Sequence, residues 1–208
     1  MSFFKNLFGA KTKPIRNLSH PKDLQVGDII KFKFLSQEDL SGKTFGISQI
    51  NTYVYDNEFY PEYVLKDTSS NIIYLMVEEE DGEGYLALSK KITKSKISDI
   101  LPQEQLEKIL KKGIGTKVKV GSRPEGLEDW LVDSYTETDD NVKGSYIKGD
   151  ARVSGSSHNA QTFKSHTLVD KSDTYALEIE VYSSNEIELS ATIYHDLSEI
   201  EEMWVGND

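Results

Sequence analysis

The sequence predicts a mainly β protein made of two tandem homologous halves. Each half is a small antiparallel sheet or an SH3-like open barrel, and one short helix joins the two in a pseudo-twofold relation. Three observations predict this class: short alternating apolar and polar runs, a hairpin pattern that occurs twice, and one strong helical stripe between the copies. The predicted parts are a basic amphipathic segment (1–16), a first β repeat (17–101), a linking helix (102–113) and a second β repeat (114–208).

Each half opens with similar strands. Residues 24–34 alternate apolar and polar side chains after a Gly-Asp turn, and residues 115–120 alternate valines with lysines. Second strands are predicted at 44–55 and 129–138. Together with the hairpins that follow, each half therefore has four or five short strands, which is typical of a strongly bent antiparallel sheet.

The hairpin at residues 62–92 returns at residues 165–193. The offset shortens by one residue at a time, as three matched pairs show: Leu65 with Leu168 (103), Leu75 with Leu177 (102) and Leu86 with Ile187 (101). The alternation of apolar residues also has the same phase in both copies. Because a slip of one residue would turn every side chain to the other face, this agreement indicates a diverged duplication.

The linking helix has clear start and stop signals. Pro102 stands near its start, Leu106, Ile109 and Leu110 form one apolar stripe, and Gly113 stands at the C-cap position. Its length of about ten residues suits a bracket between two sheets.

Two further segments are less regular. Residues 139–164 are rich in Gly, Ser, Asn and Asp, so they are predicted to be a loop insertion with one strand at Ser145–Lys148. In the tail, Leu197, Ile200 and Trp204 recur at helical spacing, which predicts a closing helical turn.

Composition excludes several classes. The 208 residues contain no cysteine, so disulfides, thiolate metal sites and Cys nucleophiles are absent. No run of about eighteen apolar residues suggests a membrane span, so we expect a cytoplasmic protein. The net charge of −11 is uneven: residues 1–100 carry 13 basic and 14 acidic residues, against 11 and 21 in residues 101–208. Such an acidic surface argues against nucleic-acid binding.

The first hairpin turn is the densest acidic run, with Glu78, Glu79, Glu80, Asp81 and Glu83. Calcium loops need oxygen ligands at alternating positions, and the D-x-D-x-D-G spacing is missing here. The favoured interpretation is a charged, solvated hairpin whose glycines supply the bend.

Glu78 and Glu180 occupy matching positions in the two copies, and two interpretations of the pair stay open. The favoured one places each on the solvent face of a half-buried strand. In the other, the two carboxylates face a shared groove between the halves.

That second interpretation defines a candidate ligand site between the halves. Aromatic residues crowd "YVYDNEFYPEY" at 53–63, where packing at a barrel rim competes with a role in binding. No catalytic residue, metal ligand or cofactor is predicted, because the histidines lack ligand spacing and no nucleotide-binding loop occurs. The candidate ligand-binding residues are Glu78, Glu180, His166, Tyr53, Tyr55 and Tyr63.

Several short motifs resemble a family. The stretches "LQVGD" at 24–28, "INTY" at 50–53, "EYVL" at 62–65 and "YLMVEEEDG" at 74–82 are similar, in order and spacing, to uncharacterised bacterial proteins catalogued as a domain of unknown function. The family pattern reads L-x-V-G-D, V-N-T-Y, E-Y/W-x-L and Y-L-x-x-E-E-D. The resemblance implies a genomic neighbourhood of phage-shock-type membrane-stress genes, and it implies no activity.

The N-terminal segment carries the functional hypothesis. Its basic, amphipathic pattern suits contact with an anionic membrane or a partner groove, and folding back onto the protein's own surface is equally open. We therefore expect a non-enzymatic binding or adaptor protein with a protein partner, at the inner face of the membrane in envelope stress; the alternative is a ligand binder or enzyme with a site between the repeats. The candidate contact residues are Phe3, Phe4, Lys5, Leu7 and Phe8.

Overall fold

A computed structural model of the chain describes residues 16–80, 82–154 and 159–206, and the protein is mainly β, as predicted. The strands are β1 (Ile29–Phe32), β2 (Thr44–Tyr55), β3 (Glu58–Lys66), β4 (Ile72–Glu80), β5 (Glu83–Lys91), β6 (Lys117–Lys119), β7 (Ser134–Ile147), β8 (Gln161–Val169), β9 (Tyr175–Tyr182), β10 (Ile187–Asp196) and β11 (Ile200–Trp204). The helices are α1 (Lys94–Ile100), α2 (Gln103–Lys112) and α3 (Ala151–Ser154), with short 3-10 turns η1 (Pro21–Asp23) and η2 (Leu197–Glu199).

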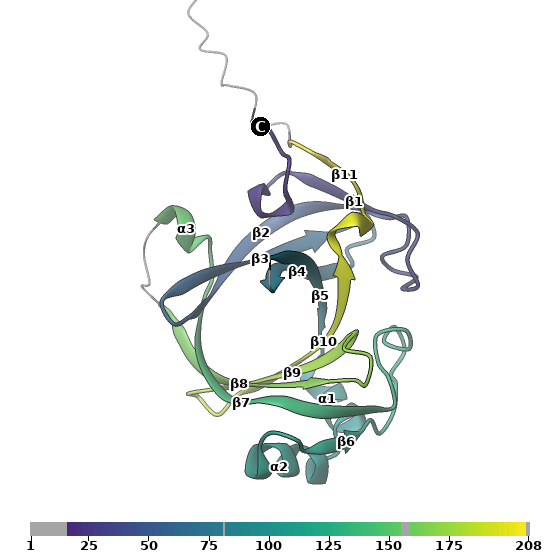
Figure 1. Cartoon of the computed structure of the whole chain (residues 1–208), viewed down its shortest axis with the longest axis vertical. Helices are drawn as coiled ribbons and strands as arrows, with labels where there is room; N and C mark the ends of the chain where they lie inside the picture. Colours follow the sequence, from purple (N-terminus) through teal and green to yellow (C-terminus); the bar gives the residue numbers. More distant parts are fainter. Residues whose placement is uncertain (1–15, 81, 155–158, 207–208) are drawn as a thin grey trace, which may run out of the picture.

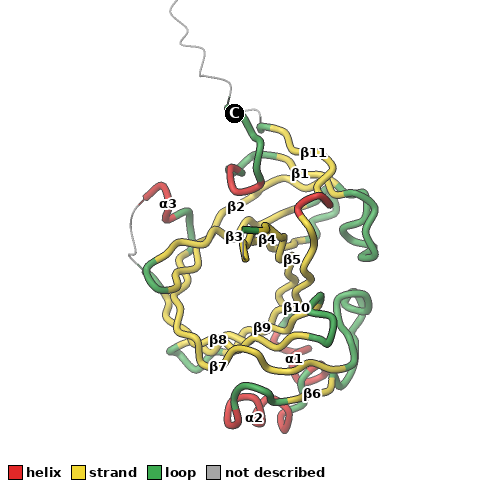
Figure 2. The backbone as a smooth tube through the Cα atoms, viewed as in Figure 1, coloured by secondary structure: helices red, strands yellow, loops and turns green. Residues whose placement is uncertain are grey.

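All strands belong to one antiparallel sheet, in the order β11-β1-β2-β3-β4-β5-β10-β9-β8-β7-β6. An additional pairing of β2 with β7 closes eight of them, β2-β3-β4-β5-β10-β9-β8-β7, into a ring (Figures 1 and 2). Where the sequence predicted two separate small sheets, the structure has one continuous sheet. Pairing of β5 with β10 and of β2 with β7 leaves no free edge among these eight strands, which is the physical gain over two open sheets.

The chain builds the ring in two passes. Strands β2 to β5 follow one another as a meander, β7 to β10 do the same, and the two meanders meet at the β5–β10 and β2–β7 pairings. The turns at matching places in the two meanders have the same type of side-chain hydrogen bonding. Asp67 accepts hydrogen bonds from the backbone N–H groups of Ser69 and Asn71, and Asp170 accepts them from those of Ser172 and Thr174.

The two faces of the ring differ in chemistry. Alternate residues of the ring strands form the apolar core, for example Leu75 on β4 and Leu88 on β5. This core lies on the outside of the ring. The residues that complete it come from β1, from α2 and from the loops before β2 and before β7, and Figure 1 shows β1 and α2 outside the ring. The remaining alternate residues point inward and are mostly polar or aromatic.

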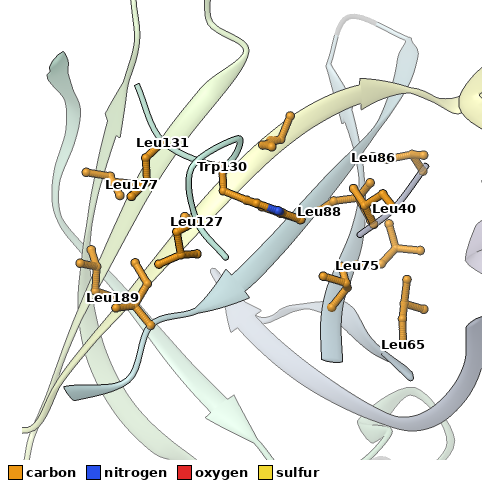
Figure 3. Packing of buried hydrophobic residues seen from close by; sticks show 14 of the residues in the cluster. Leu40, Leu65, Leu75, Leu86, Leu88, Leu127, Trp130, Leu131, Leu177 and Leu189 are labelled. Atoms are coloured by element: carbon orange, nitrogen blue, oxygen red, sulfur yellow. The ribbon is translucent and has the colours of Figure 1, made fainter. Parts of the chain in front are cut away.

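Two loops cover the core at the β5–β10 junction. Trp130 is fully buried there and donates its Nε1–H to Asp39 at 3.0 Å. The backbone N–H of Glu38 donates in turn to the Asp129 carboxylate at 2.8 Å. Figure 3 shows Trp130 between Leu127 and Leu131 on one side and Leu40 and Leu88 on the other. The loops before β2 and before β7 thus interlock over one shared core.

Two predictions were wrong. Half of the predicted loop at 139–164 is strand: β7 runs to Ile147, so it includes most of the predicted strand at Ser145–Lys148, and β8 begins at Gln161, with the short α3 between them. The polar composition of this stretch predicted a loop, but polar residues are also found in strands that face solvent or the polar interior of the ring. In the tail, the predicted helical turn is only η2, and Ile200–Trp204 is the strand β11, which pairs with β1.

The predicted linking helix corresponds to α2, where Ile109 is buried in the core. Gly113 caps it with a positive φ of 77°. Within the described ranges, no helix combines the length and the apolar character that crossing a lipid bilayer requires.

Candidate functional site

The interior of the ring holds a cavity of about 1060 Å³, which we call the ring cavity. Its lining comes from all eight ring strands, so it is the space that the closed sheet encloses. Pockets that bind small molecules commonly have volumes of about 300–1000 Å³. The ring cavity therefore has room for a small ligand.

Three carboxylates converge in the ring cavity. Glu178 and Glu180 lie two residues apart on β9, so they share its inner face. Glu78 approaches from β4, which β5 and β10 separate from β9 in the ring, and its charge acts on Glu178. Tyr85 donates its hydroxyl to Glu78 at 2.9 Å, and Tyr182 donates its hydroxyl to Glu180 at 2.5 Å.

The crowding of these carboxylates changes their acidity. Burial first, and then the charges of Glu78 and Glu180, raise the pKa of Glu178 to about 8. Burial also raises the pKa of Glu180, although hydrogen bonds from Tyr182 and Tyr53 oppose the rise. Near neutral pH the Glu178 carboxyl is therefore mostly protonated, since ionising it would add a negative charge to an already negative, partly buried cavity.

Aromatic rings form much of the wall. Tyr85 and Tyr194 meet edge to face with their centroids 5.6 Å apart, and burial raises the pKa of Tyr194 far above its usual range. Tyr55 also lines the ring cavity and packs edge to face against Phe163 at 5.9 Å. Tyr53 stacks behind Tyr55 at 6.3 Å. Tyrosine faces carry negative potential, so they add to the attraction that the carboxylates exert on a cation.

A buried ion pair fills the interior beyond the cavity lining. The Nζ of Lys91 lies 3.5 Å from the carboxylate of Glu62, which also accepts from Asn51 at 2.9 Å. The same ammonium group lies over the rings of Tyr74 and Tyr146, at 4.7 and 5.1 Å from their centroids. Lys91 is thus paired with Glu62, and its charge also acts on Glu180.

The charge of the described lining is strongly negative. It contains seven acidic residues and two basic ones, Lys22 and Arg152. Lys22 pairs with Glu79 at 2.7 Å, and Arg152 pairs with Asp150 at 2.8 Å. Both cations therefore have carboxylate partners other than Glu78, Glu178 and Glu180; the acidic members are Glu58, Glu78, Glu79, Asp139, Asp173, Glu178 and Glu180.

The structure brings together some of the predicted site residues and separates others. Glu78, Glu180 and Tyr55 line the ring cavity, which differs from the favoured interpretation of a solvent-facing Glu78 and Glu180. Tyr53 lies directly behind them. His166 does not join them: its neighbours Ser165 and Thr167 point inward, and alternation directs His166 to the outer face.

Tyr63 is also elsewhere. It is fully buried in the outer core and donates its hydroxyl to the backbone carbonyl of Lys22 at 2.8 Å. The acidic turn closes the β4–β5 hairpin, and Asp81 lies outside the described residues. The predicted contact residues of the N-terminal segment, Phe3, Phe4, Lys5, Leu7 and Phe8, also lie outside them.

Sequence reasoning missed Glu178, Tyr85 and Tyr194. A signal for Glu178 was present: in "YALEIEVY" the two glutamates are two residues apart, so a carboxylate at Glu180 implies a second on the same face. No comparable signal exists for Tyr85 and Tyr194, because their meeting depends on which strands pair.

Comparisons with models of known protein families, with curated proteins and with solved structures gave no match for this chain. The geometry of the ring cavity is therefore the main basis for a functional argument.

Proposed function

We propose that this protein binds an organic cation, specifically an alkylammonium compound, inside the ring. The observation that carries the proposal is the convergence of Glu78, Glu178 and Glu180 in one partly buried cavity. The described lining carries seven acidic residues against two basic ones, and both basic residues already form ion pairs. A positively charged guest would be attracted by the net negative charge of this lining.

The wall chemistry matches this guest. A primary ammonium group has three N–H donors, which suit carboxylate acceptors, and charge-assisted hydrogen bonds are roughly twice as strong as neutral ones. Tyr55, Tyr85 and Tyr194 offer aromatic surface, which attracts cations by about 0.5–2 kcal/mol per contact. Met76 and Val142 provide apolar surface for an alkyl chain.

Isothermal titration calorimetry on the full chain tests the proposal. Linear primary monoamines and diamines are titrated at pH 8.5, where Glu178 is largely ionised, and alcohols of the same chain length serve as neutral controls. We expect saturable binding of amines and none of the alcohols. The double variant Glu178→Gln, Glu180→Gln should weaken binding at least about tenfold, because it removes two negative charges while keeping side-chain shape.

A matched control variant separates the effect of losing a cavity carboxylate from the effect of losing any surface charge. Glu83→Gln removes one exposed carboxylate from the adjacent turn and should leave amine affinity unchanged. The proposal fails if no amine binds at millimolar concentration, or if the double variant binds as tightly as the unmodified protein.

The relation between the two halves belongs to the same proposal. We infer that they are homologous repeats with pseudo-twofold symmetry, each contributing one meander to the ring. Support comes from the matched strand order and from the turns at Asp67 and Asp170. On this view Glu78 and Glu180 enter the ring cavity from equivalent strands.

A role as an adaptor at the inner face of the membrane remains a second proposal, supported by the basic amphipathic pattern of residues 1–16. Deletion of residues 2–9, followed by vesicle co-sedimentation and partner recovery from the host, tests it. Unchanged recovery in both assays would exclude a role for this segment.

A further inference from the structure

A second polar cluster lies outside the ring cavity, on the outer side of β7 and β8. It consists of Glu137, Asp140 and His166, and we call it the Glu137 cluster. Glu137 is 1% exposed and His166 is 2% exposed, while Asp140 is partly open to solvent. None of the three lines the ring cavity, so their role is independent of amine binding.

Irregular strand geometry brings these side chains together. The register between β7 and β8 shifts twice, between Glu137 and Asp139 and again between Asp139 and Val142. Such bulges redirect side chains and are common beside functional sites. Here they allow Glu137 and Asp140, three residues apart on a strand, to approach the same histidine.

The distances suit a shared metal ion. His166 Nδ1 lies 3.0 Å from Glu137 Oε1 and 3.2 Å from Asp140 Oδ1, and one ligand atom from each residue falls within 4.8 Å of the other two. In a tetrahedral shell, bonds of about 2.0–2.2 Å from zinc to nitrogen and oxygen place neighbouring ligand atoms roughly 3.3–3.6 Å apart. The two contacts with Nδ1 are a few tenths of an ångström shorter than this, so a small outward shift of the carboxylates would admit the ion.

Hydrogen bonding alone leaves the cluster incomplete. A single Nδ1–H donor faces two carboxylates, so it cannot fully satisfy both. The other oxygen of the buried Glu137 carboxylate, Oε2, has no hydrogen-bond partner among the described residues. A buried, unsatisfied carboxylate oxygen is costly, and native structures seldom retain one without a further partner such as water or an ion.

The surrounding backbone holds Glu137 firmly and encloses Asp140. The N–H of Gly115 donates to the carbonyl of Glu137 at 2.8 Å, and the N–H of Glu137 donates to the carbonyl of Thr116 at 2.9 Å. Gly113 leaves space for Asp140: a Cβ at this glycine would lie 2.9 Å from Asp140 Oδ2. The turn after α2 thus packs its backbone directly against the cluster.

We propose that the Glu137 cluster binds a divalent transition-metal ion of the zinc class. Two carboxylates and one neutral imidazole carry a charge of −2, which a dication balances. The mixed nitrogen and oxygen ligand set suits Zn²⁺, whereas Ca²⁺ and Mg²⁺ favour oxygen ligands. Three protein ligands leave a fourth position for water on the side where Asp140 is open to solvent.

Metal titration of the full-length protein tests this. After treatment with a chelator, Zn²⁺ is titrated by calorimetry, and Co²⁺ is added in parallel to follow its visible absorption, which reports the coordination shell. We expect one Zn²⁺ per chain and a new Co²⁺ absorption band. Asp140→Asn should weaken Zn²⁺ binding at least about 100-fold and abolish the band, since it removes a charged ligand without removing bulk.

Two further variants guard against misinterpretation. Glu137→Gln should give the same loss, with circular dichroism showing that both variants fold. Asp133→Asn, at a 95% exposed side chain just before β7, is the matched control and should bind as the unmodified protein does. Absence of stoichiometric Zn²⁺ binding at micromolar concentration, or unchanged affinity in a folded Asp140→Asn variant, would overturn the proposal.

Discussion

Lys91 and Glu62 form an ion pair in the ring interior, with Nζ 3.5 Å from the carboxylate. Glu62 is 3% exposed, and burial raises its pKa although the charge of Lys91 opposes the rise. The pair places one cation inside the ring, where its charge also acts on Glu180.

Removing the cation of this pair should destabilise the fold. Lys91→Met leaves Glu62 buried without its counter-charge, and losing one member of a buried pair costs about 3–5 kcal/mol. Adding Glu62→Gln to Lys91→Met should recover part of the loss, because the remaining group is then neutral. Urea unfolding at pH 7 measures the free energy of unfolding of the single and the double variant. Equal stability of Lys91→Met and the unmodified protein would contradict the prediction.

The Glu178 carboxyl makes stability depend on pH. Its pKa is about 8 in the folded protein, against 4.5 for an unperturbed carboxyl. The folded state therefore holds an extra proton between these values, and the free energy of unfolding falls as pH rises from about 5 to about 8. Urea unfolding at pH 5.5, 7 and 8.5 measures the decline, which Glu178→Gln should reduce. The same slope in the variant would assign the dependence to other groups.

Amine binding should depend on pH in the opposite sense. An ammonium guest favours ionised Glu178, so binding releases the proton that the empty cavity holds near neutral pH. With a pKa of about 8, affinity should rise about tenfold between pH 7 and pH 9. Calorimetry in buffers of different ionisation enthalpy measures the released proton. A flat affinity profile over this range would show that Glu178 does not contact the guest.

Gly144 leaves room for the aromatic wall. A Cβ at this position would lie 2.5 Å from a ring carbon of Phe163 and 2.8 Å from one of Tyr55. Gly144→Ala should destabilise the protein by about 1–3 kcal/mol and weaken amine binding, since Tyr55 must shift. The control is Gly46→Ala, whose Cβ would meet only a backbone oxygen at 4.0 Å. Thermal unfolding and calorimetry should separate the two variants.

Trp130 should be the more important of the two tryptophans for stability. It is fully buried between the covering loops, whereas Trp204 on β11 is 39% exposed. Trp130→Ala should cost about 3–5 kcal/mol through the cavity and the lost hydrogen bond to Asp39. Trp204→Ala should cost clearly less. Chemical unfolding of both variants makes the comparison, and similar losses would show that the loops contribute little.

Much of the local structure was predictable because strand alternation and helix caps are local signals. The phase of Leu75 and Val77 on β4 placed Glu78 on the opposite face, and the same phase on β9 did so for Glu180. The stripe around Ile109 and the cap at Gly113 likewise indicated α2. The predicted loop at 139–164 was wrong for the half that is strand, because polar residues also occur in strands that have solvent or a polar interior beside them.

Local patterns in the sequence were sufficient to indicate which residues share a strand face and that Glu78 and Glu180 occupy matching positions. They did not indicate that these two carboxylates point into a closed ring. The pairing of β2 with β7 depends on the folding of the whole chain, because that contact joins residues about ninety positions apart and closes the ring. Closure makes the polar face the inner one and turns Glu78, Glu178 and Glu180 toward a common space. The two bulges in β7 likewise bring Asp140 to His166, a meeting that regular alternation does not predict.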